Sequence, residues 1–209
     1  MTSINNKSQY NESKYIYQNK PVYEFIKTSI DFVLALVLLI IFSPIFIFVI
    51  LIMYLFYGGK PFYLQERVGR NKKNFWIIKF RTMRLDAELD KPVWAVPNDS
   101  RCTSFGKILR KTSIDELPQL INILKCEMSF VGPRPERPYF LNDHIGLTGK
   151  RLLVKPGLTG LAQVNGRYSL TIEEKLKFDL EYIHNRSLWL DFKILIKTIP
   201  VVLSCKNSW

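Results

Sequence analysis

A long apolar run is the dominant feature of the chain. Residues 32–59 contain no charged side chain and consist mainly of Leu, Ile, Val and Phe. About 20 apolar residues suffice to cross the hydrocarbon core of a bilayer. The run therefore predicts a membrane-inserted helix, which we place at residues 26–59. A cleaved signal peptide is not expected, because it would have a short basic lead and a shorter apolar core.

Ser43 and Pro44 lie near the middle of this run. Proline removes one helical hydrogen bond and clashes with the preceding turn, so we expect the helix to kink or break there. Each half would then be too short to cross a bilayer alone. Basic residues flank the run on both sides, as in a segment whose two ends stay cytoplasmic. We therefore expect a re-entrant helix, with an ordinary transmembrane helix as the alternative.

Two short apolar runs after the membrane segment predict a small β-hairpin. Residues 61–64 and 75–80 are rich in aromatic and β-branched side chains, and a basic turn at residues 68–74 separates them. At the other end of the chain, residues 1–25 are polar and show no periodicity, which indicates a tail.

Helical periodicity appears in three places. In residues 107–125 apolar side chains recur at spacings of three and four, which predicts a helix with one apolar face. Thr171 and Glu174 have the spacing of a capping box at the start of a second helix. Residues 188–203 mix apolar side chains with lysines, which fits either a helix in the membrane interface or a buried C-terminal core helix.

These patterns together predict an α+β protein. The expected parts are the tail at residues 1–25, the membrane-inserted helix at residues 26–59 and a domain at residues 60–209. The domain is expected to be compact and mainly helical, with a small β-hairpin or sheet and interfacial amphipathic helices.

The charge of the chain points to an anionic partner. Thirty Lys and Arg residues against 18 Asp and Glu residues give a net charge of +12. Nucleic acid, membrane headgroups and a phosphorylated substrate all fit this charge. Three widely spaced cysteines form no metal-binding or disulfide pattern, which favours a reducing, cytosol-facing domain. With two histidines and no nucleophile-elbow serine, carboxylates and arginines must carry any chemistry.

The densest group of chemically useful side chains lies between Arg110 and Pro118, where the adjacent carboxylates Asp115 and Glu116 follow basic residues. Pro118 is tolerated only in the first turn of a helix, so we expect a helix to begin near Asp115. The helix dipole and Arg110 would hold a carboxylate there ionised, as a nucleophile or metal ligand requires. Two adjacent carboxylates in a basic chain also fit Mg²⁺ with phosphate oxygens.

A purely structural role is the alternative for the acidic pair. Ser113 and Glu116 have capping-box spacing, so Glu116 could bind a backbone N–H group. Asp115 could itself be the N-cap of the helix.

A proline-rich loop follows at residues 131–138. Its three prolines fix the backbone and Gly132 permits a tight turn, which predicts a rigid loop. Such a loop could present Arg134 and Arg137 to a phosphate bidentately. A plain surface turn is the alternative.

A glycine-containing segment at residues 155–167 carries Gln163, Asn165 and Arg167. Its glycines would let backbone N–H groups approach a ligand, and the three side chains offer donors for a base, ribose or phosphate. The segment has neither a Walker nor a Rossmann fingerprint.

Taken together, these motifs resemble the bacterial sugar transferases, also called monotopic phosphoglycosyl transferases or undecaprenyl-phosphate sugar phosphotransferases. The matching strings run in the family's order from about Ile26 to the C-terminus: DFVLAL, the Ser43-Pro44 pair, QERVGRN, FWIIKFRTM, GKILRKTSIDELPQLINILK, MSFVGPRPERP, VKPGLTGLAQVNGR and LDFKILIKTI. Cys126 departs from the family by standing where glycine is usual, which matters if the backbone there needs positive φ. Residues 141–150 match no motif.

The resemblance implies a covalent two-step reaction. Asp115 would attack the sugar-linked phosphate of a UDP-sugar, release UMP and pass the phosphosugar to polyprenyl phosphate. This step opens the assembly of capsule, exopolysaccharide or glycoconjugate. Glu116 would assist the metal or a proton transfer, with Mg²⁺ as the cofactor held by Asp115 and Glu116.

The resemblance also implies roles for further residues. Arg110, Arg134 and Arg137 would bind phosphate, and Ser43-Pro44 would make the helix re-entrant. The residues expected to line the substrate and nucleotide site are Lys79, Arg81, Gln163, Asn165 and Arg167. The implied location is the bacterial inner membrane, among membrane lipids, with the catalytic domain facing the cytoplasm. A homo-oligomer is compatible with the sequence.

A membrane-anchored binding module is the alternative that the charge allows, holding nucleic acid or acidic lipid without chemistry. Electrostatic binding alone would not require an adjacent acidic pair beside a rigid arginine loop. We therefore expect no nucleic-acid partner.

Overall fold

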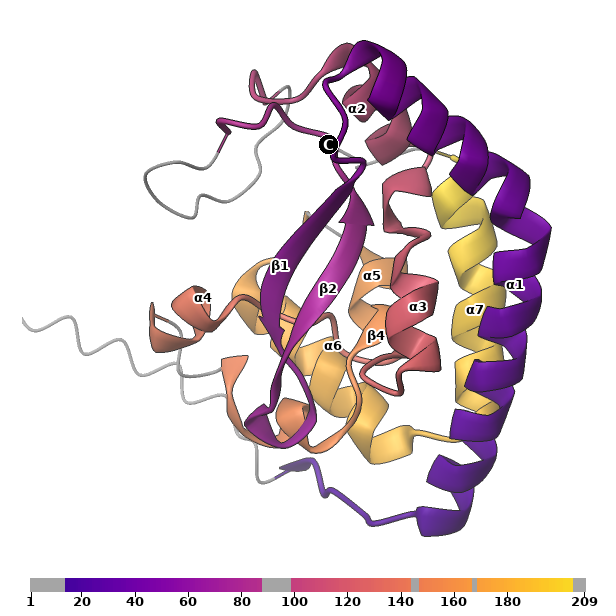
Figure 1. Cartoon of the computed structure of the whole chain (residues 1–209). Helices are drawn as coiled ribbons and strands as arrows, with labels where there is room; N and C mark the ends of the chain where they lie inside the picture. Colours follow the sequence, from indigo (N-terminus) through magenta and orange to yellow (C-terminus); the bar gives the residue numbers. More distant parts are fainter. Residues whose placement is uncertain (1–13, 88–98, 144–146, 167–168, 205–209) are drawn as a thin grey trace, which may run out of the picture.

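The computed structural model describes residues 14–87, 99–143, 147–166 and 169–204, and these residues form the predicted α+β fold (Figure 1). A long helix, α1 (Pro21–Phe56), runs along one side of a mainly helical domain. Helices α6 (Ile172–Asn185) and α7 (Leu188–Leu203) follow late in the chain, and α7 lies beside α1. The capping box predicted at the start of α6 is present.

The predicted hairpin forms from β1 (Phe62–Val68) and β2 (Asn74–Phe80), which pair antiparallel. A short 3-10 turn, η2 (Arg70–Lys72), joins the strands. Strand β1 is longer than the predicted residues 61–64. Its second half is polar, so its sequence does not read as a strand, but it pairs in register with the apolar β2.

The pattern in residues 107–125 folds as three elements instead of one helix. These are α2 (Ser104–Lys111), the 3-10 turn η3 (Ile114–Glu116) and α3 (Gln119–Leu124). Ser113 interrupts the helical path because its backbone is left-handed, with φ of 58°. A helical segment does begin near Asp115, as expected, but it is the 3-10 turn η3, and the α-helix itself begins only at Gln119.

A second small sheet joins the proline-rich loop at residues 131–138 to the glycine-containing segment at residues 155–167. Its strands β3 (Ser129–Val131) and β4 (Gly157–Thr159) pair in parallel. Between them the chain forms α4 (Pro138–Asp143) and the 3-10 helix η5 (Gly149–Leu153), and after β4 it forms α5 (Leu161–Asn165).

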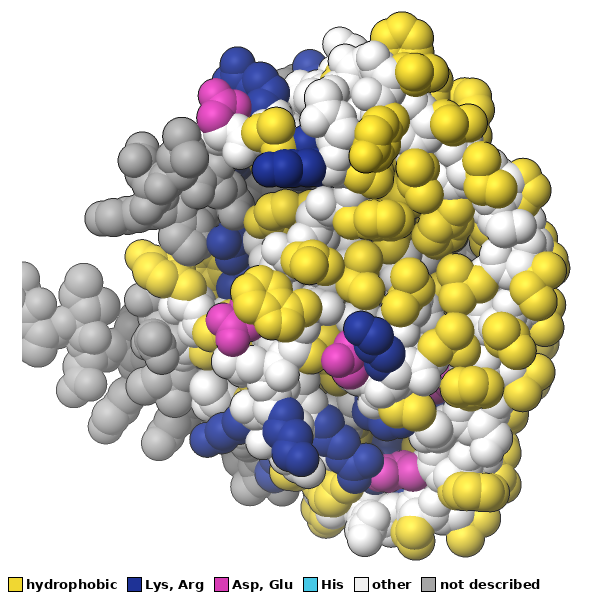
Figure 2. Space-filling view, in the orientation of Figure 1, with side chains coloured by type: hydrophobic (Ala, Val, Ile, Leu, Met, Phe, Trp, Pro, Cys, Tyr) yellow, Lys and Arg dark blue, Asp and Glu magenta, His cyan; other side chains and the backbone are white. Residues whose placement is uncertain are grey.

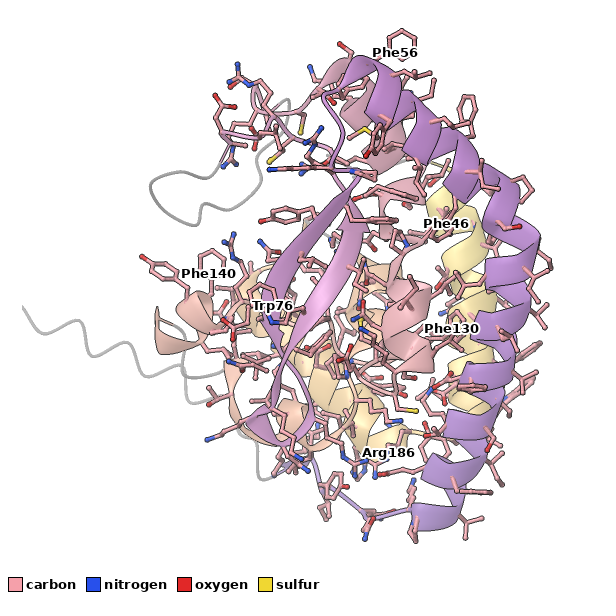
Figure 3. All side chains as sticks on the ribbon, viewed as in Figure 1. Phe46, Phe56, Trp76, Phe130, Phe140 and Arg186 are labelled. Carbon is pink, nitrogen blue, oxygen red and sulfur yellow. The ribbon has the colours of Figure 1, made fainter. Side chains whose placement is uncertain are left out.

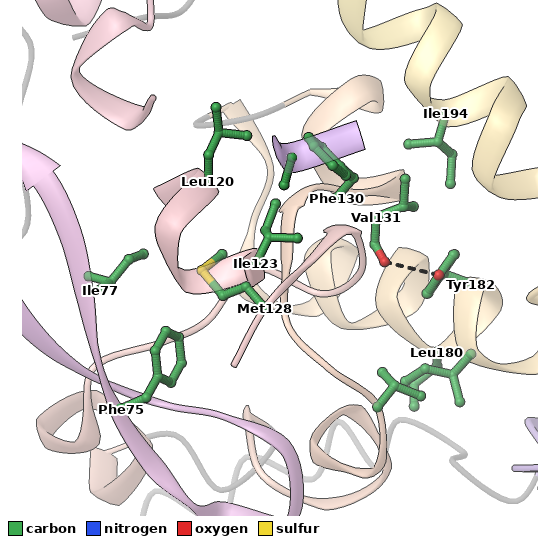
Figure 4. Close-up of a cluster of buried hydrophobic side chains, with 13 residues drawn as sticks. Phe75, Ile77, Leu120, Ile123, Met128, Phe130, Val131, Leu180, Tyr182 and Ile194 are labelled. Carbon is green, nitrogen blue, oxygen red and sulfur yellow. Dashed lines mark hydrogen bonds between the residues drawn. The ribbon is translucent and has the colours of Figure 1, made fainter. Parts of the chain in front are cut away.

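The main hydrophobic core lies between the hairpin, α3, β3 and the C-terminal helices (Figure 4). Ile77, Leu120 and Phe130 are buried there, and each such side chain stabilises the fold by about 1.5–3 kcal/mol. The Tyr182 hydroxyl donates a hydrogen bond of 3.1 Å to the Val131 carbonyl oxygen, which ties α6 to β3.

Helix α1 begins at Pro21, earlier than the predicted residue 26, because its polar first turns bind the domain. Lys27 Nζ lies 3.1 Å from a carboxylate oxygen of Asp191 on α7. Glu24 pairs with Arg186 at 3.2 Å, and the arginine side chain points toward this end of α1 (Figure 3). These polar side chains look like part of a tail in the sequence, but they fasten the helix to the domain.

The Ser43-Pro44 pair bends the helix without breaking it. Proline 44 has no N–H group for the carbonyl oxygen of Ile40, one turn earlier. The Ser43 hydroxyl donates to that oxygen at 2.8 Å and so replaces the missing donor. Helix α1 therefore runs through Pro44 as one curved element of 36 residues, about 54 Å long at 1.5 Å per residue. The predicted break is corrected to a bend.

Helix α1 is long and apolar enough to cross a membrane, and it leaves most of its apolar side chains uncovered. Figure 2 shows the yellow surface that results along this side of the molecule. An exposed apolar surface of this extent marks membrane contact, so the protein is membrane-associated.

Helix α7 continues the exposed apolar surface. Asp191 and Ile194 are buried against the domain, whereas Trp189, Phe192 and Ile199 are more than half exposed. The alternative of a buried core helix is therefore wrong. An amphipathic helix with one apolar outer face fits the interface location predicted for residues 188–203.

Cys126 occupies a backbone conformation that favours glycine. Its φ is 58°, and its N–H donates 2.9 Å to the Ile123 carbonyl oxygen at the end of α3. The left-handed conformation costs a residue with a Cβ atom about 1–2 kcal/mol relative to glycine. The glycine usual in related sequences thus has a backbone reason, and this chain carries the strain.

We expect Cys126→Gly to stabilise the protein by about 0.5–1 kcal/mol, the relieved strain less the greater freedom of glycine in the unfolded chain. Thermal unfolding of the detergent-solubilised protein measures the effect. Cys126→Ala is the matched control, because it removes the thiol and keeps the Cβ atom. An equal rise in melting temperature for both variants would show that the thiol, and not the backbone, limits stability.

Candidate active site

A cavity of about 960 Å³ opens beside the hairpin and reaches from the domain centre to α1 and α7. The predicted site residues that line it are Lys79, Arg81, Arg110, Asp115, Glu116, Arg134, Arg137 and Gln163. Asn165 is not among its lining residues: the Asn165 side chain is exposed and donates 2.7 Å to the Leu161 carbonyl oxygen. Arg167 lies outside the described residues. The fold thus gathers side chains from four separate motifs.

Glu116 joins the hairpin to the proline-rich loop. Lys79 Nζ on β2 lies 3.1 Å from Glu116 Oε1, and the Arg134 guanidinium contacts both carboxylate oxygens. Burial favours the neutral acid, but the cations of Arg134 and Lys79 hold the pKa of Glu116 well below its usual value. Glu116 is therefore an ionised carboxylate fixed by two cations.

The structural alternative for the acidic pair is wrong. The Ser113 side chain does not cap the η3 turn, and the side chain of Glu116 reaches Lys79 and Arg134 instead of the helix backbone. The N-cap of α3 is Pro118, so Asp115 is not a cap either.

Asp115 has the opposite electrostatic environment from its neighbour. Only 8% of it is exposed. Burial, and secondly the charge of Glu116, raise its pKa from 3.8 to about 6, against the opposing effects of Lys79, Arg110 and Arg134. The expected stabilisation by a helix dipole is small, because Asp115 lies in a three-residue 3-10 turn and α3 begins only at Gln119. Near pH 7 the carboxylate is still mostly ionised, and it is poorly solvated, which favours nucleophilic attack.

The glycines of the two loops allow close packing of backbone on backbone. A Cβ atom on Gly157 would lie 2.1 Å from the Gly132 nitrogen, and one on Gly160 would lie 2.2 Å from the Gly132 oxygen. Neither Gly132 nor Gly157 has positive φ. The glycines thus let the loops that carry Arg134 and Gln163 pack backbone against backbone.

We expect Gly160→Ala to lower transfer activity at least tenfold and to destabilise the fold by about 1–3 kcal/mol, because the Gly132 backbone must move. Gly69→Ala is the comparison: its Cβ atom would meet the Lys73 carbonyl oxygen at 3.0 Å, a tight contact but a much milder one. Gly69 lies in the turn of the hairpin, so a smaller loss of stability and activity is expected. Activity and melting temperature can be measured on the same preparations. Full activity in Gly160→Ala would show that the loop packing does not position the site.

A buried ion pair anchors the proline-rich loop to α6. Arg151 donates 2.8 Å to the Arg134 carbonyl oxygen and pairs at 2.9 Å with Asp179 of α6. Both side chains are 3% exposed, so the loop is part of the packed domain and not a plain surface turn. Sequence reasoning missed this pair and Asp191. The available signal was an acidic residue on the apolar face of each amphipathic helix, where a buried charge requires a partner.

Three cavity side chains, Arg67, Arg81 and Gln163, have buried polar atoms with no hydrogen-bond partner among the described residues. Both amide atoms of Gln163 belong to this group, as do Nε and Nη1 of Arg81. Nearby, Arg110 Nε donates 2.8 Å to the Thr82 hydroxyl. Buried polar atoms of this kind need a partner, which a bound ligand could supply.

The acidic pair alone offers few ligands for Mg²⁺. Within the described residues no three His, Cys, Asp or Glu side chains come together. Magnesium commonly binds one or two carboxylates and completes its shell with phosphate oxygens and water. Asp115 in a cavity lined by arginines fits such a site when a phosphorylated ligand is present. Glu116 already contacts two cations, with which a metal ion would compete.

The fold and the cavity define a membrane-associated protein with a carboxylate and arginine site suited to phosphate groups. The bacterial sugar transferase family profile matches residues 22–205. The exopolysaccharide production protein ExoY of Rhizobium meliloti is 38% identical over 205 residues, with 91% of each chain covered. The chain belongs to the bacterial sugar transferase family and is an enzyme.

Longer relatives match the same region. A UDP-N-acetylgalactosamine-undecaprenyl-phosphate N-acetylgalactosaminephosphotransferase of Aeromonas hydrophila is 39% identical, and the match covers 88% of this chain and 45% of the relative. An undecaprenyl-phosphate galactose phosphotransferase of Salmonella typhimurium is also 39% identical, with 86% and 40% covered. The chain thus spans less than half the length of these two relatives.

Proposed function

We propose that this enzyme transfers a sugar-1-phosphate from a UDP-sugar to undecaprenyl phosphate or a similar polyprenyl phosphate. The products are UMP and a polyprenyl-diphosphate-linked sugar, the opening step of an exopolysaccharide, capsule or glycoconjugate. One observation carries the proposal: adjacent carboxylates with opposite pKa shifts lie in an arginine-lined cavity whose far wall is formed by the membrane helix.

The proposed reaction has two displacements at one phosphorus atom. A carboxylate oxygen of Asp115 forms a bond to the sugar-linked phosphorus, and the bond from that phosphorus to the bridging oxygen breaks, so UMP leaves with the oxygen. A phosphate oxygen of the lipid then attacks the same phosphorus and frees the Asp115 carboxylate. Arginines that bind the phosphoryl oxygens stabilise their negative charge in both steps.

The surrounding residues have separate proposed roles in phosphate binding and charge balance. Arg134, Arg137 and Arg110 are placed to bind phosphate oxygens, and Lys79 balances Glu116. The Glu116 carboxylate holds Lys79 and Arg134 in position, and it could accept a proton only in exchange for those contacts.

Mg²⁺ is proposed as the cofactor, held by Asp115 together with diphosphate oxygens of the donor. It would neutralise charge on the diphosphate and on the leaving UMP. Glu116 joins the shell only if Lys79 or Arg134 moves to a substrate phosphate.

The membrane arrangement proposed is a re-entrant helix with the domain in the cytoplasm. Both ends of α1 contact the same domain: Lys27 binds Asp191, and the Tyr57 carbonyl oxygen accepts a hydrogen bond from Arg81. A helix that crossed the bilayer would place its ends on opposite sides, where one domain cannot contact both. UDP-sugars are cytoplasmic donors, which favours the cytoplasmic face.

The proposal is tested by nucleotide release from a panel of UDP-sugars with Mg²⁺ and undecaprenyl phosphate. UDP-galactose and UDP-N-acetylgalactosamine belong in the panel because the names of two relatives contain these sugars. Release of UMP from one donor is the expected result. Release of UDP would mean direct glycosyl transfer and would contradict the proposal.

A further inference from the structure

Arg81 lines the cavity but has no role in the donor reaction proposed above. It follows β2, and its backbone N–H donates 2.8 Å to the Pro61 carbonyl oxygen. The guanidinium is buried, with 7% of the residue exposed, and its Nη2 donates to the Tyr57 carbonyl oxygen. Its Nε and Nη1 have no partner among the described residues, although both are buried. An arginine with unmet donors on a cavity wall is suited to an anion.

Two pairs of basic side chains on the cavity wall differ in their partners. Lys79 and Arg134 are bound to Glu116. In the other pair, Arg81 and Arg110, the Nε of Arg110 is held by the hydroxyl of Thr82, the residue that follows Arg81 in the chain. Arg110 is close enough to Asp115 to lower its pKa. A phosphate bound by Arg110 would therefore lie near Asp115 without displacing Lys79 and Arg134 from Glu116.

The position of Arg81 relative to the membrane helix indicates a lipid phosphate. Tyr57 caps the C-terminal end of α1, so the guanidinium sits where the apolar helix ends. The end of a membrane-inserted helix marks the level of the lipid headgroups. Phosphate groups of lipids lie at that level, whereas a nucleotide approaches from the aqueous side.

From the end of α1 toward its middle, the cavity wall formed by α1 and α7 carries apolar side chains. Phe42 and Ile45 of α1 contribute to it, as do Leu195 and Val202 of α7. In Figure 3 Phe46 points from α1 toward the hairpin, where its ring centroid lies 5.1 Å from that of Phe80, whereas Phe56 points away from the domain. An isoprenoid chain could follow this wall from the cavity to the exposed surface of α1 and α7.

We propose that Arg81 and Arg110 bind the phosphate of the polyprenyl phosphate acceptor, with its hydrocarbon chain lying along Phe42 and Ile45. The inference rests on the proposed function and assigns the acceptor a subsite separate from the Lys79, Glu116 and Arg134 group. The acceptor phosphate then enters from the membrane side, and its oxygen attacks the phosphosugar on Asp115 while Arg134 holds the phosphoryl oxygens.

The test separates the two half-reactions in Arg81→Met, Arg81→Lys and the control Lys107→Met. Lys107 is exposed on α2 and does not line the cavity, so the control removes a neighbouring charge only. UMP release without lipid measures the donor step, and turnover at varied undecaprenyl phosphate in nanodiscs measures the acceptor step. Wild-type protein that releases no UMP would refute the proposed function itself.

Arg81→Met is expected to raise the KM for undecaprenyl phosphate at least about tenfold, because it removes charge-assisted hydrogen bonds to the phosphate. UMP release without lipid should stay within about twofold of wild type, and Arg81→Lys should recover part of the loss. A matching loss in the donor step for both variants would overturn the inference, as would an unchanged KM. An effect confined to nanodiscs with anionic phospholipid would overturn it too, because Arg81 would then bind bulk lipid phosphate.

Discussion

Asp115→Asn is expected to lower turnover on the order of 10⁴-fold or more, because the amide cannot act as the nucleophile. The substitution keeps the size of the side chain. It also removes a carboxylate whose burial raises its pKa to about 6, so the ionised form is disfavoured in the folded protein. We therefore expect Asp115→Asn to unfold at the same temperature as wild type or a higher one.

The matched control for this substitution is Asp86→Asn. Asp86 forms an exposed pair with Arg84 at 3.8 Å, with 63% of its side chain exposed. Its loss should leave turnover within about twofold, since exposed ion pairs contribute little. Turnover of the Asp115→Asn variant near the wild-type level would remove Asp115 from the chemistry.

Arg134→Met is expected to lower kcat/KM for the UDP-sugar by about 10²–10³-fold. Arg134 is proposed to hold phosphoryl oxygens, a contribution of about 2.7–4 kcal/mol in comparable sites. It is also a main counter-charge of Glu116, so its removal leaves that buried carboxylate with Lys79 alone and raises the pKa of Glu116. Both effects lower kcat/KM.

Arg134→Lys should lower kcat/KM for the UDP-sugar less than Arg134→Met does, because lysine keeps the positive charge and loses only the bidentate geometry. Initial rates at varied UDP-sugar, with Lys107→Met beside them, measure the effect. A change of less than about threefold in Arg134→Met would mean that the loop arginine does not contact the donor.

Local sequence pattern predicted most of the elements. Two short runs rich in aromatic and β-branched side chains, separated by a basic turn, predicted the hairpin of β1 and β2, and the Thr171 capping box predicted the start of α6. The single helix expected in residues 107–125 failed at Ser113, since a left-handed serine leaves no trace in hydrophobic periodicity. That failure lies two residues before Asp115, where the turn places Asp115 and Glu116 in different surroundings.

The site was predictable in composition and not in geometry. The acidic pair and the arginine loop could be recognised from residue types, because phosphate chemistry needs them. The contact between Lys79 and Glu116 joins positions 37 residues apart, and it depends on how the hairpin packs on η3. Asn165 and Gln163 looked equivalent in the sequence, yet α5 directs only Gln163 to the cavity.

The attachment of α1 also depended on tertiary contacts that sequence could not supply. Asp191 accepts a hydrogen bond of 2.8 Å from Tyr23 and pairs with Lys27. The Tyr182 hydroxyl, which shares its one hydrogen between Asp191 and the Val131 carbonyl oxygen, lies 2.8 Å from the Asp191 carboxylate. Tyr182 in turn binds β3, which leads directly into the loop of Arg134. The membrane helix and the loop that carries Arg134 are thus held by one buried network.

The most direct test of the account is intact-mass analysis of purified protein mixed with its UDP-sugar and Mg²⁺ in the absence of lipid. The account predicts one UMP released per enzyme and a mass increase equal to the sugar phosphate, located on the peptide that contains Asp115 and lost when undecaprenyl phosphate is added. UMP released only in the presence of lipid, with no change in enzyme mass, would contradict the covalent mechanism.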